Sequence, residues 1–222
     1  MPHTFTSRHE LLRAVPVTLA LIALSVIGFL LYYLGAPLSW ISALTFQAFS
    51  IDGREVVFYA SPGEYWRVIT PIFLHFGWLH ITFNCLWLWE LGALVEQRLG
   101  GGWLLALVLL CGGGGNLAQA WYSGPSLFGG MSGVVYALLG FCWVYNALLP
   151  SGRLWVPKPI IIFMLVWLVF CMVAPTELLG IGSIANAAHL GGLILGCLLA
   201  APLALRRRQL ESDDDSFHDE DN

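Results

Sequence analysis

Hydrophobic residues occur in long blocks along this chain, separated by short polar breaks. Six mainly apolar stretches stand out, at about 15–35, 74–95, 103–122, 132–149, 158–175 and 184–205. A helix needs roughly 20 such residues to cross about 30 Å of hydrocarbon. The pattern therefore predicts an all-α, polytopic membrane protein with six transmembrane helices.

The segment 36–73, between the first two stretches, has a different character. Asp, Gly, Arg and Pro residues interrupt it, yet it is rich in Trp, Phe and Tyr. Aromatic residues with a polar edge favour the boundary between lipid and water. We therefore expect an interfacial loop that does not cross the membrane.

The composition agrees with a lipid environment, because 58% of the 222 residues are apolar and only 11% are charged. The bilayer is thus an expected partner, and nucleic acid is not. Five cysteines fall one in each stretch from the second to the sixth, and we interpret them as small hydrophobic residues. The first stretch is too long for a cleavable signal and lacks a small-residue cleavage site.

The distribution of Lys and Arg predicts the orientation, because these residues favour the cytoplasmic side. With six spans both termini share one side, and eight of the ten cations fall there: Arg8, Arg13, Arg98, Arg153, Lys158, Arg206, Arg207 and Arg208. We expect a short cytoplasmic N-terminus (1–14), a membrane domain (15–205) and a cytoplasmic tail (206–222). The tail holds seven of the 14 acidic residues, which favours disorder over a binding motif.

This topology brings four polar residues to one depth of the membrane. Ser132 begins the fourth stretch, His189 lies one to two turns into the sixth, and His80 and Asn84 lie two to three turns into the second. All three stretches start from the outer side. Because a helix rises 1.5 Å per residue, the four side chains should lie within about 15 Å of one membrane face.

Each of these residues also has a purely structural interpretation. A serine in a membrane helix often bonds back to its own helix, and a histidine beside a polar partner can be structural. An ionisable group inside a span is costly, however, and usually indicates function. His75 and His80 are five residues apart and do not share a helix face, so we expect no metal site.

The residue types allow nucleophilic catalysis. A serine hydroxyl becomes a good nucleophile when a histidine takes its proton, and His189 or His80 can serve as that base. A serine at a helix start also offers its backbone N–H to an oxyanion, and Asn84 can add a second donor. The glycines 129 and 130 permit a tight turn before the serine. The GxSG sequence alone is a weak signal.

Several motifs together make the chain resemble the rhomboid intramembrane serine proteases, most closely the bacterial GlpG type. The resemblance covers about residues 60–205, and it rests on EYWR (64–67), HFGWLHITFN (75–84), SGP (123–125), GGMSGVVYALLG (129–140) and ANAAHLGGLILG (185–196). It implies a serine endopeptidase without cofactor or metal, which cuts transmembrane helices of membrane proteins near the outer face. In a bacterial inner membrane, that face is periplasmic.

The resemblance also implies roles for particular residues. Ser132 would be the nucleophile and His189 its general base, with no aspartate. His80, Asn84 and the Ser132 amide would form the oxyanion hole, and Tyr136 would pack against His189. The supporting positions are Gly130, Gly133, Gly192 and Gly196.

The chain departs from the family pattern in two respects. With about 14 residues before the first stretch, we expect it to be without the soluble N-terminal domain of some relatives. Gln119 matches a polar residue that in relatives keeps water near the serine, but Pro71 and Gly115 stand where relatives have polar residues.

Small residues recur every four positions in the sixth stretch, at 188, 192, 196 and 200. This spacing predicts close packing against a neighbouring helix, which we expect to be the fourth. Two other functions stay open: an inactive rhomboid-like protein that binds membrane clients, and a small transporter. The first would lack the Ser or the His, and the second favours inverted repeats, which the sequence does not show.

Overall fold

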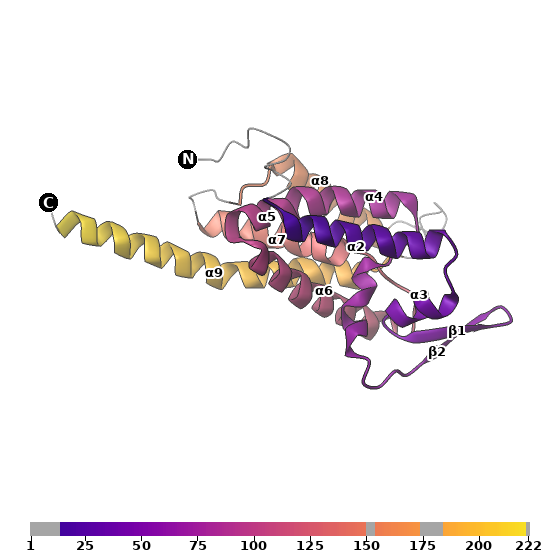
Figure 1. Cartoon of the computed structure of the whole chain (residues 1–222). Helices are drawn as coiled ribbons and strands as arrows, with labels where there is room; N and C mark the ends of the chain where they lie inside the picture. The colour runs from indigo at the N-terminus through magenta and orange to yellow at the C-terminus, as the bar shows by residue number, and fades with distance from the viewer. Residues whose placement is uncertain (1–13, 150–153, 174–183, 221–222) are drawn as a thin grey trace.

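The computed structural model describes residues 14–149, 154–173 and 184–220, with side chains up to Ser212. The structure is mostly helical, as the sequence predicts, and its helices form an elongated bundle (Figure 1). The start of α2 and the far end of α9 lie at one end of the bundle, and a β-hairpin projects at the other end.

The helical bundle follows the six apolar stretches closely. Its helices are α2 (Pro16–Tyr33), α4 (Trp78–Trp87), α5 (Ala93–Leu99), α6 (Gly101–Ser123), α7 (Ser132–Leu148), α8 (Lys158–Val173) and α9 (Asn186–Glu220). A π-helical segment, η3 (Leu88–Gly92), connects α4 to α5 without a break. Three described helices are long and apolar enough to span a membrane, namely α2, α6 and the part of α9 up to Ser212, whereas α7 and α8 are apolar but shorter.

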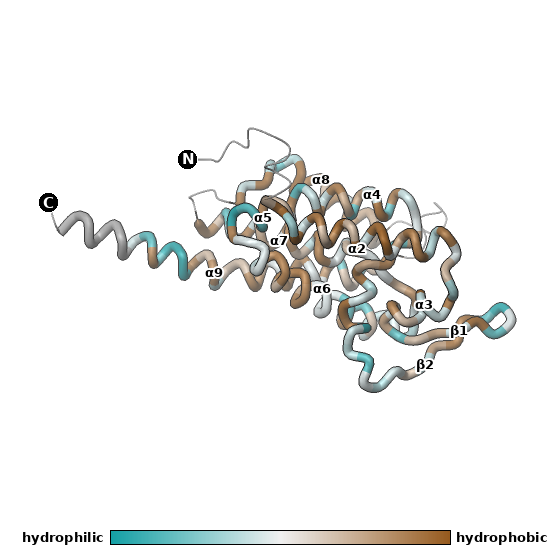
Figure 2. Tube along the Cα trace, in the orientation of Figure 1, coloured by the Kyte–Doolittle hydropathy of each residue, from teal (hydrophilic) through white to brown (hydrophobic). Residues whose placement is uncertain are grey.

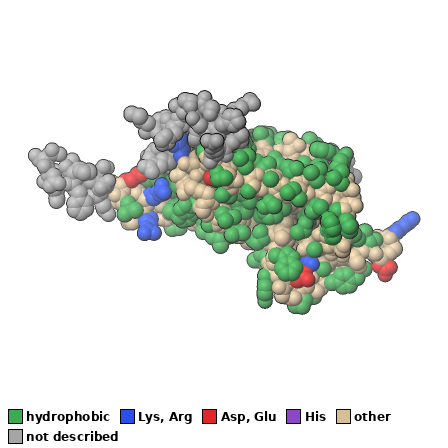
Figure 3. Space-filling view, in the orientation of Figure 1, with side chains coloured by type: hydrophobic (Ala, Val, Ile, Leu, Met, Phe, Trp, Pro, Cys, Tyr) green, Lys and Arg blue, Asp and Glu red, His purple; other side chains and the backbone are tan. Residues whose placement is uncertain are grey.

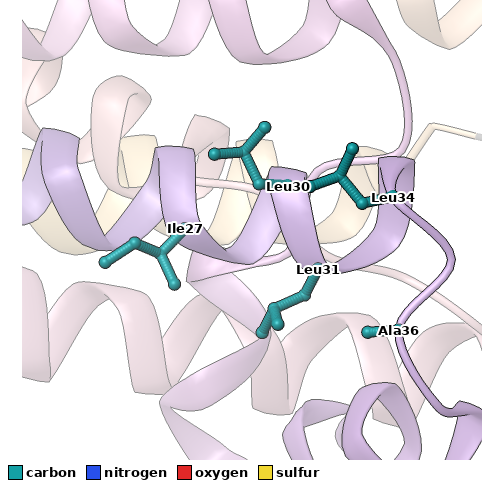
Figure 4. Close-up of a pocket in the computed structure, with 5 residues that line it drawn as sticks. All are labelled: Ile27, Leu30, Leu31, Leu34 and Ala36. Carbon is teal, nitrogen blue, oxygen red and sulfur yellow. The ribbon is translucent and has the colours of Figure 1, made fainter.

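The surface of the bundle suits a lipid environment. Apolar residues dominate its length, and the polar segments lie at the hairpin turn, around α5 and on the extension of α9 (Figure 2). Hydrophobic side chains cover most of the visible face, and the charged ones gather toward the two ends (Figure 3). On α2 an open apolar depression is lined by Ile27, Leu30, Leu31, Leu34 and Ala36 (Figure 4).

The segment between α2 and α4 contains structure that the all-α prediction missed. After α3 (Leu38–Leu44) the chain forms an antiparallel hairpin of β1 (Ala48–Asp52) and β2 (Glu55–Tyr59), followed by the 3₁₀ helices η1 (Tyr65–Val68) and η2 (Thr70–Phe73). Gly53 adopts a positive φ of 61° in the two-residue turn, where hairpins favour glycine. The aromatic and β-branched residues on either side suit the paired strands.

Arg67 connects two parts of this segment to each other. Its buried guanidinium donates hydrogen bonds to the carbonyls of Ser42 and Thr45, the latter at 2.9 Å, and it pairs with Glu64 at 2.5 Å. A buried cation is stable only when such partners satisfy it. The guanidinium therefore holds the end of α3 against η1.

The helix α9 extends into the tail. Residues 206–220 continue the α9 helix, where the acidic composition favours disorder. The physical reason is that extending a helix already stabilised by packing costs far less than starting a new one.

The centre of the bundle is α7, which is buried on all sides from Gly133 to Cys142. Its closest neighbour is α9. A Cβ atom built on Gly192 would lie 2.0 Å from the Gly133 carbonyl oxygen, and one on Gly196 would lie 2.0 Å from that of Ala137. The backbones of α7 and α9 thus touch, and this confirms the predicted role of the small residues.

Candidate functional site

Ser132 is the first residue of α7, and a glycine turn leads the chain into it. Gly130 has a φ of 114°, and its N–H donates to the Pro71 carbonyl at 2.9 Å. A Cβ on Gly130 would lie 2.4 Å from Nε2 of His80. Glycine is therefore required here both by the backbone conformation and by the histidine beside it.

The structure brings Ser132 and His189 into direct contact. Nε2 of His189 lies 2.7 Å from Oγ of Ser132, which is a hydrogen-bond distance. His189 lies in the first turn of α9 and is only 6% exposed. The close contact between Gly192 and Gly133, three residues after His189 and one after Ser132, holds the two helix starts together.

Tyr136 lies one turn below Ser132 and packs against the imidazole of His189, with 5.1 Å between the ring centroids. Its hydroxyl donates to the Met164 carbonyl on α8 at 3.0 Å. The expected contact between Tyr136 and His189 is confirmed. Nδ1 of His189 is buried and has no hydrogen-bond partner among the described residues.

His80 and Asn84 lie on one face of α4, but they are closer to the N-terminal end of the helix than the sequence predicts. Residues 74–77 precede the helix, with Leu74 and Gly77 in extended conformations, so α4 begins at Trp78 and His80 lies in its first turn. Nδ2 of Asn84 donates to the His80 carbonyl at 2.9 Å. This bond uses one amide proton, and the second is left for another acceptor.

His75 is a site residue whose role the sequence does not reveal. It is fully buried, and its Nε2 accepts a hydrogen bond at 3.3 Å from the backbone N–H of Met131, the residue before Ser132. Nε2 must therefore be unprotonated, so Nδ1 carries the proton and donates to the Phe73 carbonyl at 3.1 Å. Its ring lies 4.9 Å from that of His80. His75 thus connects the segment before α4 to the turn that holds the serine.

The arrangement defines the class of site. A serine hydroxyl and a histidine meet at the N-terminal ends of α7 and α9. The first backbone N–H groups of α7 have no partner within their helix, and the positive ends of both helix dipoles favour negative charge. Such a site can activate the hydroxyl and stabilise an oxyanion. Within the described residues, no group of three or more His, Cys, Asp or Glu side chains could hold a metal ion.

The fold and this pair define a helical membrane protein with a serine–histidine site. The chain belongs to the rhomboid family, because residues 62–206 match the rhomboid domain model.

Three similar proteins are each named rhomboid protease GlpG. Those of Serratia proteamaculans and Pectobacterium atrosepticum are 39% identical to this chain over 191 and 188 residues, and that of Yersinia enterocolitica is 37% identical over 191 residues. Each alignment covers 85% of this chain. The chain spans 63% of the length of these relatives.

Proposed function

We propose that this chain is an intramembrane serine endopeptidase that cuts transmembrane segments of other membrane proteins through a Ser132–His189 dyad. The observation that carries the proposal is the 2.7 Å contact between the two side chains at the start of α7 and α9. The names of the relatives support the same activity.

In the proposed reaction Oγ of Ser132 attacks the carbonyl carbon of the scissile peptide bond while Nε2 of His189 takes the hydroxyl proton. The protonated imidazole then gives this proton to the leaving amine, and an acyl-enzyme remains. His189 next removes a proton from a water molecule, which attacks the ester carbonyl. As the C–Oγ bond breaks and the carboxylic acid product leaves, His189 returns that proton to Oγ of Ser132. Nδ1 of His189 has no hydrogen-bond partner among the described residues, and Tyr136, which packs on one side of the imidazole, helps to orient it in place of an acidic third residue.

The oxyanion forms beside the first turn of α7. The backbone N–H of Ser132 belongs to the groups that have no partner within the helix, and it lies at the positive end of the helix dipole. His80, whose Nε2 faces Gly130, and the remaining amide proton of Asn84 complete the proposed oxyanion hole. Preorganised donors of this kind are worth roughly 10²–10³-fold in rate each.

Lateral access from the lipid is proposed at α8. Two hydrogen bonds connect this helix to the site, from the Tyr136 hydroxyl to the Met164 carbonyl and from Nδ2 of Asn186 to the Cys171 carbonyl at 2.9 Å. The outer face of α8 is exposed at Ile162 and Val166. We also expect lateral entry near residues 176–183, which lie outside the described residues.

The substrates are transmembrane helices with small residues at the cut and helix-weakening residues below it. A helical carbonyl is shielded by its hydrogen bond and must be released before it can be attacked. The proposed membrane domain has six spans in a bacterial inner membrane. Both termini lie in the cytoplasm, and the site opens to the periplasmic side, as the distribution of Lys and Arg favours.

A client-binding protein without activity and a small transporter are the competing functions. Either would leave Ser132 unreactive toward a serine-directed electrophile. The test is therefore labelling of the detergent-solubilised protein with a fluorophosphonate, together with cleavage of a transmembrane substrate. Ser132→Ala and His189→Ala should each abolish both.

The matched control is Ser123→Ala, which removes a hydroxyl at the C-terminal end of α6 that bonds to Ser126 and nearby carbonyls. It should label and cleave like the parent protein. Substantial cleavage by Ser132→Ala would refute the serine mechanism.

A further inference from the structure

Gln119 makes an unusual contact with the start of α9. It lies one turn before the end of α6 and is only 7% exposed. Its side-chain oxygen, Oε1, accepts hydrogen bonds from the backbone N–H groups of Ala187 and Ala188 at 3.0 and 3.2 Å. One side chain thus binds two amides in the first turn of another helix.

These two amides have no partner within their own helix, because the first four N–H groups of an α-helix are always left over. A polar residue just before the helix usually satisfies them. Here that residue is Ala185, which has no side-chain acceptor, and Asn186 uses its amide to donate to the Cys171 carbonyl on α8. Gln119 therefore supplies from α6 the cap that the local sequence lacks.

The capped turn is the one that carries His189. Ala188 precedes it directly, and the N–H of His189 bonds to the Ala185 carbonyl at 3.2 Å. On either side, a Cβ built on Gly115 of α6 or on Gly133 of α7 would lie 3.1 Å from the Ala188 carbonyl oxygen. Packing therefore limits movement of the turn toward α6 or α7. The two hydrogen bonds to Gln119 fix its rotation about the helix axis and its position along that axis.

We propose that Gln119 is a positioning residue for His189, acting as the N-terminal cap of α9 and so holding the imidazole at hydrogen-bond distance from Ser132. This inference rests on the proposed protease function. It assigns the side-chain oxygen of Gln119 to α9, because both of its lone pairs accept backbone N–H groups. A role in holding the hydrolytic water is the competing assignment.

The experiment compares Gln119→Met, which keeps the length but removes the acceptor, with Gln119→Glu, which restores it. Three quantities are measured in detergent: the rate at which a fluorophosphonate reacts with Ser132, kcat and KM for a transmembrane substrate, and the melting temperature. Gln119→Met should lower both the phosphonylation rate and kcat by about 10²-fold, since a misplacement of about 1 Å costs this much. KM should change little, and Gln119→Glu should recover most of the loss. Should Gln119→Met not yield folded protein, Gln119→Asn withdraws the same oxygen by one methylene and takes its place.

The matched control is Asn116→Leu, one turn earlier on α6. Its buried amide donates to the Val68 carbonyl at 2.8 Å and so connects α6 to η1, away from α9. This variant should lower the melting temperature while phosphonylation, measured well below that temperature, stays near the parental rate.

Three results would overturn the inference. If Gln119→Met slows turnover but leaves the phosphonylation rate unchanged, Gln119 helps to hold the hydrolytic water, because phosphonylation of Ser132 does not use a water molecule. If Gln119→Met and Asn116→Leu lose phosphonylation and thermal stability in the same proportion, or if Gln119→Glu rescues nothing, Gln119 is merely structural. Absence of labelling in the parent protein is a different result, because it would refute the proposed function itself and the inference with it.

Discussion

Gly192 is the position at which one added methyl group should separate His189 from Ser132. In the Gly192→Ala variant the new Cβ would start 2.0 Å from the Gly133 carbonyl oxygen and 2.9 Å from its carbon. Contacts under about 3 Å are not tolerated, and the opposing atoms are backbone of a buried helix, so they cannot rotate away. The two helices must therefore move apart by about 1 Å.

This displacement sets the expected magnitudes. His189 lies less than one turn from Gly192, so its 2.7 Å contact with Ser132 should lengthen beyond hydrogen-bond range. A misplacement of about 1 Å costs about 10²-fold in rate. Overpacking of a core costs about 1–3 kcal/mol, and each kcal/mol lowers the melting temperature of a chain of this size by about 2–4 °C.

The assay measures substrate cleavage and thermal unfolding of the same detergent sample. Gly192→Ala should lose both activity and stability, whereas Ser132→Ala should lose activity alone. The matched control is Gly102→Ala in α6, where an added Cβ meets nothing within 4 Å. It should be neutral or slightly stabilising, since alanine favours a helix by about 1 kcal/mol over glycine.

A Gly192→Ala protein that melts and cleaves like the parent would refute this reasoning. It would mean that α7 and α9 adapt to the methyl group without moving His189, so the glycine contact would not control the dyad.

Three further predictions concern other parts of the molecule. Asn84→Ala should lower kcat by roughly 10²–10³-fold while Ser132 stays reactive to a fluorophosphonate; unchanged turnover would make Asn84 a packing residue. Glu96→Gln should lower the melting temperature without altering the phosphonylation rate measured well below that temperature. The Glu96 carboxylate accepts three hydrogen bonds from the start of α2 at 2.7–2.8 Å, and hydrogen bonds to a charged group are worth about 1.5–3 kcal/mol each. An unaltered melting curve would contradict this prediction. In intact cells a membrane-impermeant thiol reagent should label a cysteine introduced at Ser61 but not one at Ser212, and the reverse pattern would invert the proposed orientation.

The site could be predicted largely from the sequence because, in a helix that crosses a membrane, the position of a residue along the helix gives its depth in the membrane. Once the apolar stretches fix where helices begin, Ser132, His189, His80 and Asn84 fall at one level by counting residues. The bond between Ser132 and His189 and the ring contact of Tyr136 agree with this prediction. The catalytic roles of these residues stay predictions.

The prediction of the depth of His80 was less accurate, because an apolar sequence does not specify where its helix begins. Residues 74–77 are hydrophobic enough to lie in a span, yet they precede the helix, with Leu74 and Gly77 extended. The preceding 3₁₀ helix and the hydrogen bonds of His75 decide this conformation. Contacts between residues far apart in the sequence leave no local pattern.

The sequence by itself determined the features that follow from residue type and spacing. These are the apolar helices that a lipid bilayer requires, the small residues at every fourth position in α9, and the glycine turn before Ser132. These features are periodic or local, so they can be read in order. Only the tertiary structure decided which side chains serve another element, as Gln119 caps α9, Glu96 caps α2 and Arg67 connects η1 to the end of α3. The physical reason is that a buried polar group must find partners wherever the fold offers them. In these three cases the partners lie 22 to 79 residues away along the chain.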